Sequence, residues 1–232
     1  MVFPLRCAFA TLLLLGAAAA TGAEFTGYLN VTTDYVKRGV SQSAGDPAAQ
    51  LGVDVAFSNG LFGGFWGSTI DIDNGPSRHR DKETNYYVGF GHDLTNLWRV
   101  TGHVVAYRYP GQTGNVDYDY DEYSAGVSYD DRIWLEYSHT PDLYNTGLSA
   151  SNVDLYTEWF ETGSWVVGGG GGYYDTSKLT NSAYWYWSLG ATGSFKHADV
   201  DVRIHDTSRS VPIISTQDRA DTRAVLTIRI PF

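Results

Sequence analysis

The chain has 232 residues, enough for one large domain or two small ones, and its formal net charge of −10 argues against a nucleic-acid partner, which would need a basic face. Tyr (17), Gly (26) and Trp (7) are abundant, whereas Cys and Met occur once each. This composition favours strands and turns over helices, because aromatic side chains suit a pleated surface.

The N-terminal segment, residues 1–23, is expected to be a secretory signal peptide. One positive charge, Arg6, precedes an apolar run from Cys7 to Ala20, and small residues then offer a cleavage site before Glu24. The run is too short to remain in a bilayer as a spanning helix. The single cysteine lies at the start of the run, which argues against a lipid anchor. The mature domain, residues 24–232, is therefore expected to be exported and free of disulfides.

From residue 25 onward, apolar and polar side chains alternate at period two. In the first segment Phe25, Leu29 and Val31 share one face, and Thr26 and Asn30 share the other. The same alternation recurs, in chain order, at 50–58, 98–107, 133–138, 199–204 and 225–230. We count about twelve such segments of about nine to thirteen residues, the length of a tilted strand that crosses a bilayer. Strands of globular proteins are shorter, about five or six residues.

The connections between these segments alternate between short and long. Short turns are expected at 59–60, 93–96, 130–131, 161–163 and 195–198, and long loops near 37–47, 73–82, 110–118, 141–150, 175–182 and 206–218. Tyr and Trp residues cluster at both ends of the segments. Outer-membrane barrels combine short periplasmic turns, long outer loops and two aromatic girdles. The sequence therefore predicts an all-β fold, a transmembrane antiparallel up-and-down β-barrel of about 12 strands. A secreted soluble β-sandwich would share the alternation but not the strand length or the loop asymmetry.

Four stretches of the first half carry a family resemblance. They are DYVKRGVSQSAGDPAAQLGVDV at 34–55, GLFGGFWGSTID at 60–71, YRYPG at 107–111 and YDEYSAGVSY at 120–129. Together they resemble the TorF-family porins of the Gram-negative outer membrane, which implies a porin-like barrel but no solute and no catalytic residues. That family tends to place two acids at alternate positions where this chain has Glu83 and Asn85. The family's lumen charge is therefore not carried over to this position.

Two short motifs suggest ligand sites but lack the residues that such sites need. Asp117, Asp119 and Asp121 resemble the start of a calcium loop, yet the glycine at its sixth position and the closing glutamate are missing. We interpret these acids as a solvated extracellular rim. The glycine run at 168–172 is followed by no Lys-Ser or Lys-Thr pair, so a phosphate site is not supported. In a strand, glycines allow bending and close approach of bulky neighbours. No metal site and no cofactor are expected.

His139 is the residue on which an enzymatic alternative depends. It lies in the lipid-facing phase between Ser138 and Thr140. A serine nucleophile needs a base within hydrogen-bonding reach and a third group that orients the base. Neighbours on one strand point to opposite faces, so Ser138 and His139 cannot pair directly, and only a partner on another strand could complete a site. We expect no catalytic residues and leave a lipid hydrolase as an alternative.

Ionisable residues in the inward phase form the main functional prediction. The pore-lining candidates are Arg99, His103, Glu122, Glu136, Asp154, Glu158, Asp199, Asp201, Arg203, Arg223 and Arg229. Charges inside a barrel need water or partners, so we expect a wet, partly ion-paired lumen. About twelve strands should leave a narrow channel at best, because eight strands are filled by side chains and sixteen leave a wide pore. An acidic excess would favour cations.

The sequence thus predicts an outer-membrane porin of a Gram-negative bacterium that gives passive diffusion of small hydrophilic solutes. Lys37 and Arg38 are extracellular-loop candidates, together with the acidic rim, and this loop is expected to narrow or gate the mouth. The C-terminal Phe232 resembles the signal read by the barrel assembly machinery, so that machinery, outer-membrane lipids and lipopolysaccharide are expected partners. A closed structural or adhesive barrel is the other alternative.

Overall fold

The computed structural model describes residues 22–73, 78–110, 117–208 and 217–232. The predicted signal peptide falls almost wholly outside these residues and stays a prediction. Twelve antiparallel strands close into one barrel, in which each strand pairs with its neighbours in the chain and the first pairs with the last. They are β1 (Ala23–Thr32), β4 (Ala48–Phe57), β5 (Leu61–Asp73), β6 (Arg78–Asp93), β7 (Trp98–Arg108), β8 (Tyr120–Tyr129), β9 (Ile133–Thr140), β10 (Ala150–Thr162), β11 (Trp165–Asp175), β12 (Ala183–Ser194), β13 (Asp199–Thr207) and β14 (Arg223–Pro231).

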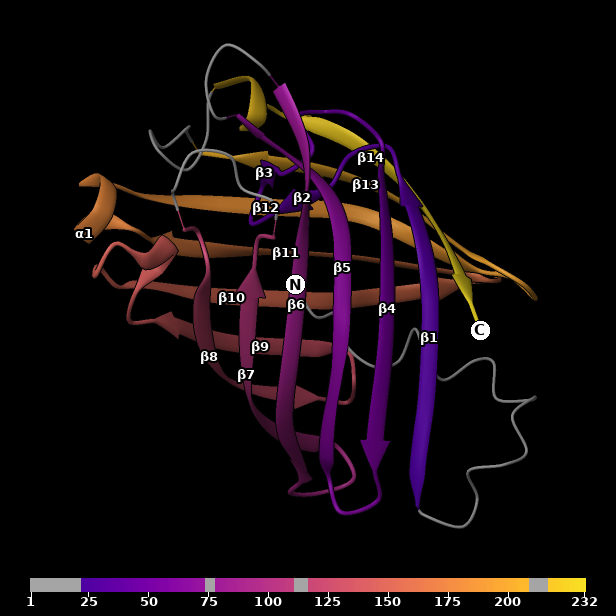
Figure 1. Cartoon of the computed structure of the whole chain (residues 1–232). Coiled ribbons are helices and arrows are strands. Elements are labelled where there is room, and N and C mark those ends of the chain that lie inside the picture. Colours follow the sequence, from indigo (N-terminus) through magenta and orange to yellow (C-terminus); the bar gives the residue numbers. More distant parts are fainter. Residues whose placement is uncertain (1–21, 74–77, 111–116, 209–216) are drawn as a thin grey trace.

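The predicted fold class and strand number are confirmed. In Figure 1 the strands of the front wall, β1 and β4 to β7, run nearly at right angles to those of the back wall. Such crossing is expected when strands tilt by about 35–45° to the axis of a barrel. Pairing of β1 with β14 leaves no unpaired sheet edge, which satisfies the backbone groups inside a lipid bilayer.

The two faces of the wall differ as the alternation predicts. Large apolar side chains face outward on most strands of the wall, and Val88 and Trp185 expose 62% and 63% of their surface. Asn30, Gln50 and Arg203 point inward and are buried. An apolar exterior around a polar interior is the arrangement of a membrane barrel and the reverse of a soluble one. In the part of the chain that the structure describes, no helix is long and apolar enough to cross a membrane.

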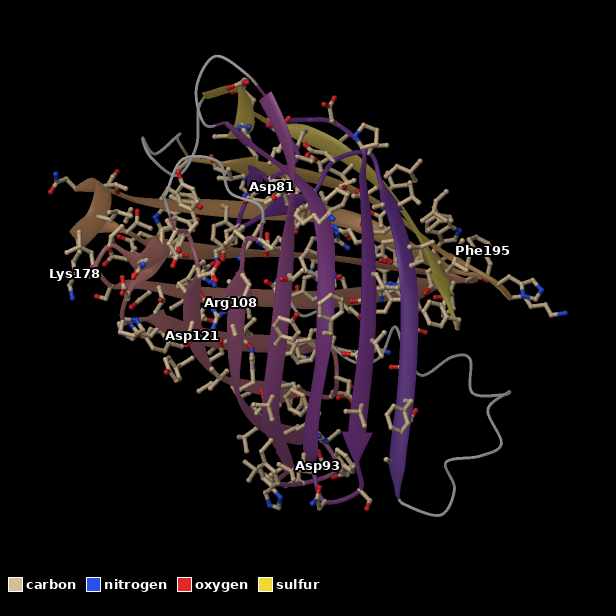
Figure 2. The ribbon with its side chains drawn as sticks, in the orientation of Figure 1. Asp81, Asp93, Arg108, Asp121, Lys178 and Phe195 are labelled. Atoms are coloured by element: carbon tan, nitrogen blue, oxygen red, sulfur yellow. The ribbon has the colours of Figure 1, made fainter. Side chains whose placement is uncertain are left out.

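The connections alternate in length, with one departure from the prediction. A long loop was expected at 73–82, but β5 and β6 continue to pair as far as Asp73 and Arg78. Main-chain hydrogen bonds extend this ladder past the apolar alternation on which the prediction rested, so the sequence pattern underestimates the two strands. Three of the other long connections carry the short helices η2 (Leu143–Asn145), α1 (Ser177–Thr180) and η3 (Gln217–Arg219). Lys178 on α1 and Phe195 in a short turn mark the two ends of the barrel in Figure 2.

The glycine run of β11 has a packing role. The ring of Tyr186 on β12 lies where a side chain at Gly172 would project, and the ring of Tyr156 on β10 covers Gly170 in the same way. Inward-facing glycines thus give the tyrosines of both neighbouring strands room to lie flat against the wall. The structural interpretation of this run therefore has a physical basis in the barrel.

Candidate functional site

The connection between β1 and β4 enters the barrel instead of standing outside it. Within residues 33–47, which we call the interior hairpin, β2 (Val36–Lys37) pairs with β3 (Val40–Ser41) around a two-residue turn. Arg38 and Gly39 form that turn with φ of 50° and 76°, as a type I′ hairpin turn requires. In Figure 1 β2 and β3 lie between the strands of the front and back walls.

The tip of the interior hairpin reaches the far wall. A side chain at Gly39 would collide with Thr207 on β13 and Tyr186 on β12, so the backbone approaches these strands more closely than other residues would allow. The base is fixed by the Asp34 carboxylate, which accepts hydrogen bonds from Ser41 (2.6 Å), Ser43 (2.9 Å) and Arg223 (2.5 Å). The hairpin is thus held at both ends and lies across the interior.

Arg38 makes the strongest contact between the interior hairpin and the wall. Its Nη1 and Nη2 donate to the two oxygens of Glu122 on β8, at 2.9 and 2.8 Å. Its guanidinium also lies over the Tyr174 ring of β11, with 4.6 Å between the guanidinium carbon and the ring centroid. A bidentate pair of this kind fixes the orientation of the guanidinium and strengthens the contact, because the planar guanidinium matches the geometry of the carboxylate.

Lys37 points to a neighbouring part of the wall. Its Nζ lies 3.5 Å from the centroid of the Tyr107 ring, donates to the Tyr120 hydroxyl at 3.0 Å and lies 3.8 Å from Oε1 of Glu83. Burial lowers the pKa of Lys37 below its ordinary value of 10.5, and the nearby Glu83 carboxylate opposes that shift. Glu83 is fully buried and also accepts a hydrogen bond from Asn85 at 2.9 Å.

All eleven pore-lining candidates stand at inward positions of the register. They are Arg99, His103, Glu122, Glu136, Asp154, Glu158, Asp199, Asp201, Arg203, Arg223 and Arg229. Many are paired with a neighbour: Arg99 with Asp93 at 2.7 Å, and Arg203 with Asp201 at 3.1 Å. Whether solute passes along this face stays a prediction.

The interior is closed at the hairpin and more open toward the short turns. The carboxylate side chains of Glu83 and Glu122 beside the hairpin are 0% and 5% exposed, whereas those of Asp201 and Glu136 are 22% and 36% exposed. The sequence predicted Lys37 and Arg38 as part of an extracellular loop. The structure places them inside the barrel, because their charges find carboxylates on the inner wall.

The acidic rim lies outside the barrel interior. Asp121 and Asp119 both face Arg108, at 2.8 and 3.7 Å, and Figure 2 shows Arg108 and Asp121 close together on the outer side of β7 and β8. Asp117 accepts a hydrogen bond from the Asp119 backbone at 2.9 Å. The three acids therefore do not converge on one point. Over the described ranges, no group of three or more His, Cys, Asp or Glu side chains is placed to hold a metal ion.

On the outer face, His139 has a partner on the next strand. Its Nδ1 lies 2.9 Å from Oγ of Ser151 on β10, and the Tyr137 hydroxyl lies 3.1 Å from the same oxygen. This is the cross-strand serine that the sequence left open. A group that orients the imidazole is also required for a nucleophile. Within the described part of the chain, Ser151 is the hydrogen-bonding partner of the His139 ring.

Sequence reasoning missed several residues of the interior. Glu83 shares its inward phase with Asn85 and Tyr87, so the period-two pattern of its strand could have identified it as an interior residue. The tyrosines that hold Lys37 and Arg38 carry the same signal, because Tyr107 is in phase with His103 and Tyr120 is in phase with Glu122.

A family model described as "Bacterial protein of unknown function (Gcw_chp)" matches residues 16–227. The chain belongs to this family. No curated protein matches it. The Gcw_chp barrel is similar to several solved structures, and in these the shared feature is the fold.

Among the solved structures, outer membrane phospholipase A from Escherichia coli is 11% identical, with 94% of each chain covered and a TM-score of 0.51. LpxR from Salmonella typhimurium is 10% identical over 89% of this chain and 99% of that chain (TM-score 0.49), and Salmonella typhi OmpF is 12% identical over 91% and 98% (TM-score 0.46). At 11% identity the likeness to the phospholipase A barrel shows the fold alone and no activity.

Proposed function

We propose that this protein is an outer-membrane porin of a Gram-negative bacterium, through which small hydrophilic solutes diffuse passively. One observation carries the proposal: the barrel interior is lined with charged and hydrogen-bonding side chains from the hairpin to the short turns. A barrel that served only as a structural element would be stabilised equally well by apolar filling, since buried ion pairs contribute little net stability. The resemblance to TorF-family porins supports the same function.

In this proposal the interior hairpin sets the width of the path. Solute enters at the long-loop end, passes the constriction formed by Lys37 and Arg38 against the opposite wall, and reaches the more open half beyond it. No cofactor is needed, because the solute moves down its own gradient. Lipopolysaccharide and other outer-membrane lipids contact the apolar exterior. The terminal Phe232, which is 68% exposed on that exterior, serves as the assembly signal.

Single-channel recording in planar bilayers tests the porin function. The purified full-length barrel is expected to give stepwise currents in KCl. A heat-modifiable, correctly folded barrel that passes no current at any voltage would refute the porin and favour the closed structural or adhesive barrel. Asymmetric KCl then gives the preference for cations or anions.

The pairing of His139 and Ser151 favours a lipid hydrolase as a second candidate. The pair faces outward at the long-loop end of its strands. Release of fatty acid from phospholipid micelles, abolished by Ser151→Ala, would support it. Ser138→Ala is the matched control, because Ser138 points inward from the same part of β9.

A further inference from the structure

The groups of the inner wall that hold Lys37 and Arg38 are acidic and aromatic. We call this set the cation cradle and define it by Glu83, Tyr107, Tyr120, Glu122 and Tyr174. Its positive partners are Lys37 and Arg38, and both belong to the interior hairpin. Without Lys37 and Arg38, the cradle would be two carboxylates surrounded by ring faces, deep inside the barrel.

The half of the cradle that holds Arg38 has the chemistry of a guanidinium site. Glu122 supplies two parallel acceptors, at 2.8 and 2.9 Å, and Tyr174 supplies a ring face on one side. Bidentate acceptance and stacking on an aromatic ring are the two contacts that distinguish a guanidinium from other cations. A free guanidinium compound would find the same contacts.

The half that holds Lys37 has the chemistry of an ammonium site. The Nζ atom lies 3.5 Å from the centroid of the Tyr107 ring, 3.0 Å from the Tyr120 hydroxyl and 3.8 Å from the Glu83 carboxylate. An aromatic face attracts an ammonium strongly once water is removed. One half of the cradle thus suits a guanidinium and the other half suits a primary ammonium.

We propose that the cation cradle is a binding site for small organic cations that carry a guanidinium or a primary ammonium, and that Lys37 and Arg38 occupy it as tethered counterparts. This inference rests on the proposed porin function for the passage of such solutes. The binding site itself can be tested without any current.

Exchange explains how a closed site can still pass cations. If the hairpin cations leave the cradle alone, two deeply buried carboxylates remain unpaired, which is strongly unfavourable. If a solute cation arrives as Arg38 leaves, one charge-assisted contact replaces another. Departure of the tethered cation is therefore coupled to arrival of a free one, whereas anions and neutral solutes gain nothing from the cradle.

Chemical rescue tests the site. The variant Arg38→Ala removes the tethered guanidinium, and n-propylguanidinium, which carries a guanidinium on the same three-carbon chain as arginine, is added to the detergent-solubilised full-length barrel. We expect it to raise the Tm of R38A by a few degrees, and to leave the Tm of R38A/E122Q unchanged. Neutral n-propylurea, of the same shape, should have no effect. Equal responses to the two compounds would overturn the proposal.

Two further comparisons make this test decisive. Arg108→Ala removes an arginine that pairs with Asp121 at 2.8 Å outside the barrel, so n-propylguanidinium should not raise its Tm. If R38A alone does not refold, the yield of refolded barrel becomes the readout. The yield should then recover with n-propylguanidinium and not with n-propylurea, and the same low yield with both compounds would also refute the site.

Planar bilayers separate this inference from the porin function. In K37Q/R38Q we expect the K⁺/Cl⁻ permeability ratio to rise at least about fivefold. This is the Boltzmann factor for the Coulomb energy between two unit charges about 4 Å apart in bulk water. n-Propylguanidinium should block that current. An unchanged ratio without block would overturn the role of the cradle in passage and leave the porin intact. No current in any variant would refute the porin, and the rescue experiment would still decide whether the cradle binds cations.

Discussion

Glu122→Gln offers the sharpest test of how the interior hairpin is held. The substitution keeps the size of the side chain but removes its charge, so the Arg38 guanidinium loses both charge-assisted acceptors and stays buried. Removing one partner of a buried ion pair costs about 3–5 kcal/mol. At about 1.4 kcal/mol per factor of ten, this shifts the balance between docked and released hairpin by a factor of about 10² to about 4 × 10³.

At the tip, the hairpin then keeps the contacts of Lys37 with Tyr107, Tyr120 and Glu83. The stacking of Lys37 on Tyr107 contributes about 2 kcal/mol when desolvated. The main-chain ladder of the barrel does not depend on Arg38, so E122Q should release the hairpin and leave the barrel folded. We expect trypsin to cut after Lys37 or Arg38 in E122Q and to leave the wild-type hairpin intact, as mass spectrometry of the fragments will show.

Asp121→Asn is the matched control for this prediction. Asp121 is adjacent in the chain but points outward, and its pair with Arg108 is partly exposed, with 45% and 36% of the two side chains accessible. Exposed pairs of this kind contribute about 1 kcal/mol or less. D121N should therefore resist trypsin at the hairpin as the wild type does. If E122Q resists equally well, the bidentate pair does not hold the hairpin and the reasoning fails.

Three further predictions concern the hairpin and the C-terminus. Gly39→Val should expose the hairpin to trypsin as E122Q does, because a branched side chain at φ of 76° is strained and collides with the opposite wall; an intact hairpin would contradict the turn assignment. Burial lowers the pKa of Lys37, so its ammonium loses the proton at a lower pH than the ordinary value of 10.5 would require. Loss of this charge leaves the Glu83 carboxylate without its ion-pair partner and removes the free-energy cost of a buried ammonium. The K⁺/Cl⁻ ratio should accordingly rise with pH in the wild type and stay flat in K37Q, and a parallel rise in both would exclude Lys37 as the cause. Deletion of Phe232 should lower the amount of heat-modifiable barrel in the outer membrane severalfold, whereas Phe195→Ala, which removes an exposed aromatic in a short turn, should not; equal yields would remove Phe232 as an assembly signal.

The alternation of apolar and polar residues was sufficient to predict the barrel wall. Each strand places alternate side chains on opposite faces, so the face of Arg203 or Glu136 follows from its position in the strand. The same rule reaches its limit at 73–82, where the ladder continues beyond the periodic segment. Periodicity indicates which residues face lipid, and it does not show how far the hydrogen-bonded pairing of two strands continues.

The His139 pair shows a second limit. The sequence establishes that His139 faces outward and that Ser138 does not, but it cannot name a partner on another strand. Register decides this, because a shift of one residue between β9 and β10 would turn Ser151 to the interior.

The sequence by itself thus determined a chain of twelve long strands with a lipid-facing side, an ionisable side and connections that alternate in length. These features depend on neighbours along the chain and on the solvent that each face meets. Only the tertiary structure decided that the first long connection folds into the barrel and that Arg38 meets Glu122, 84 positions away. The physical reason is that a charged loop is equally compatible with water outside and with carboxylates inside. The choice depends on which acidic and aromatic groups barrel closure brings together around it.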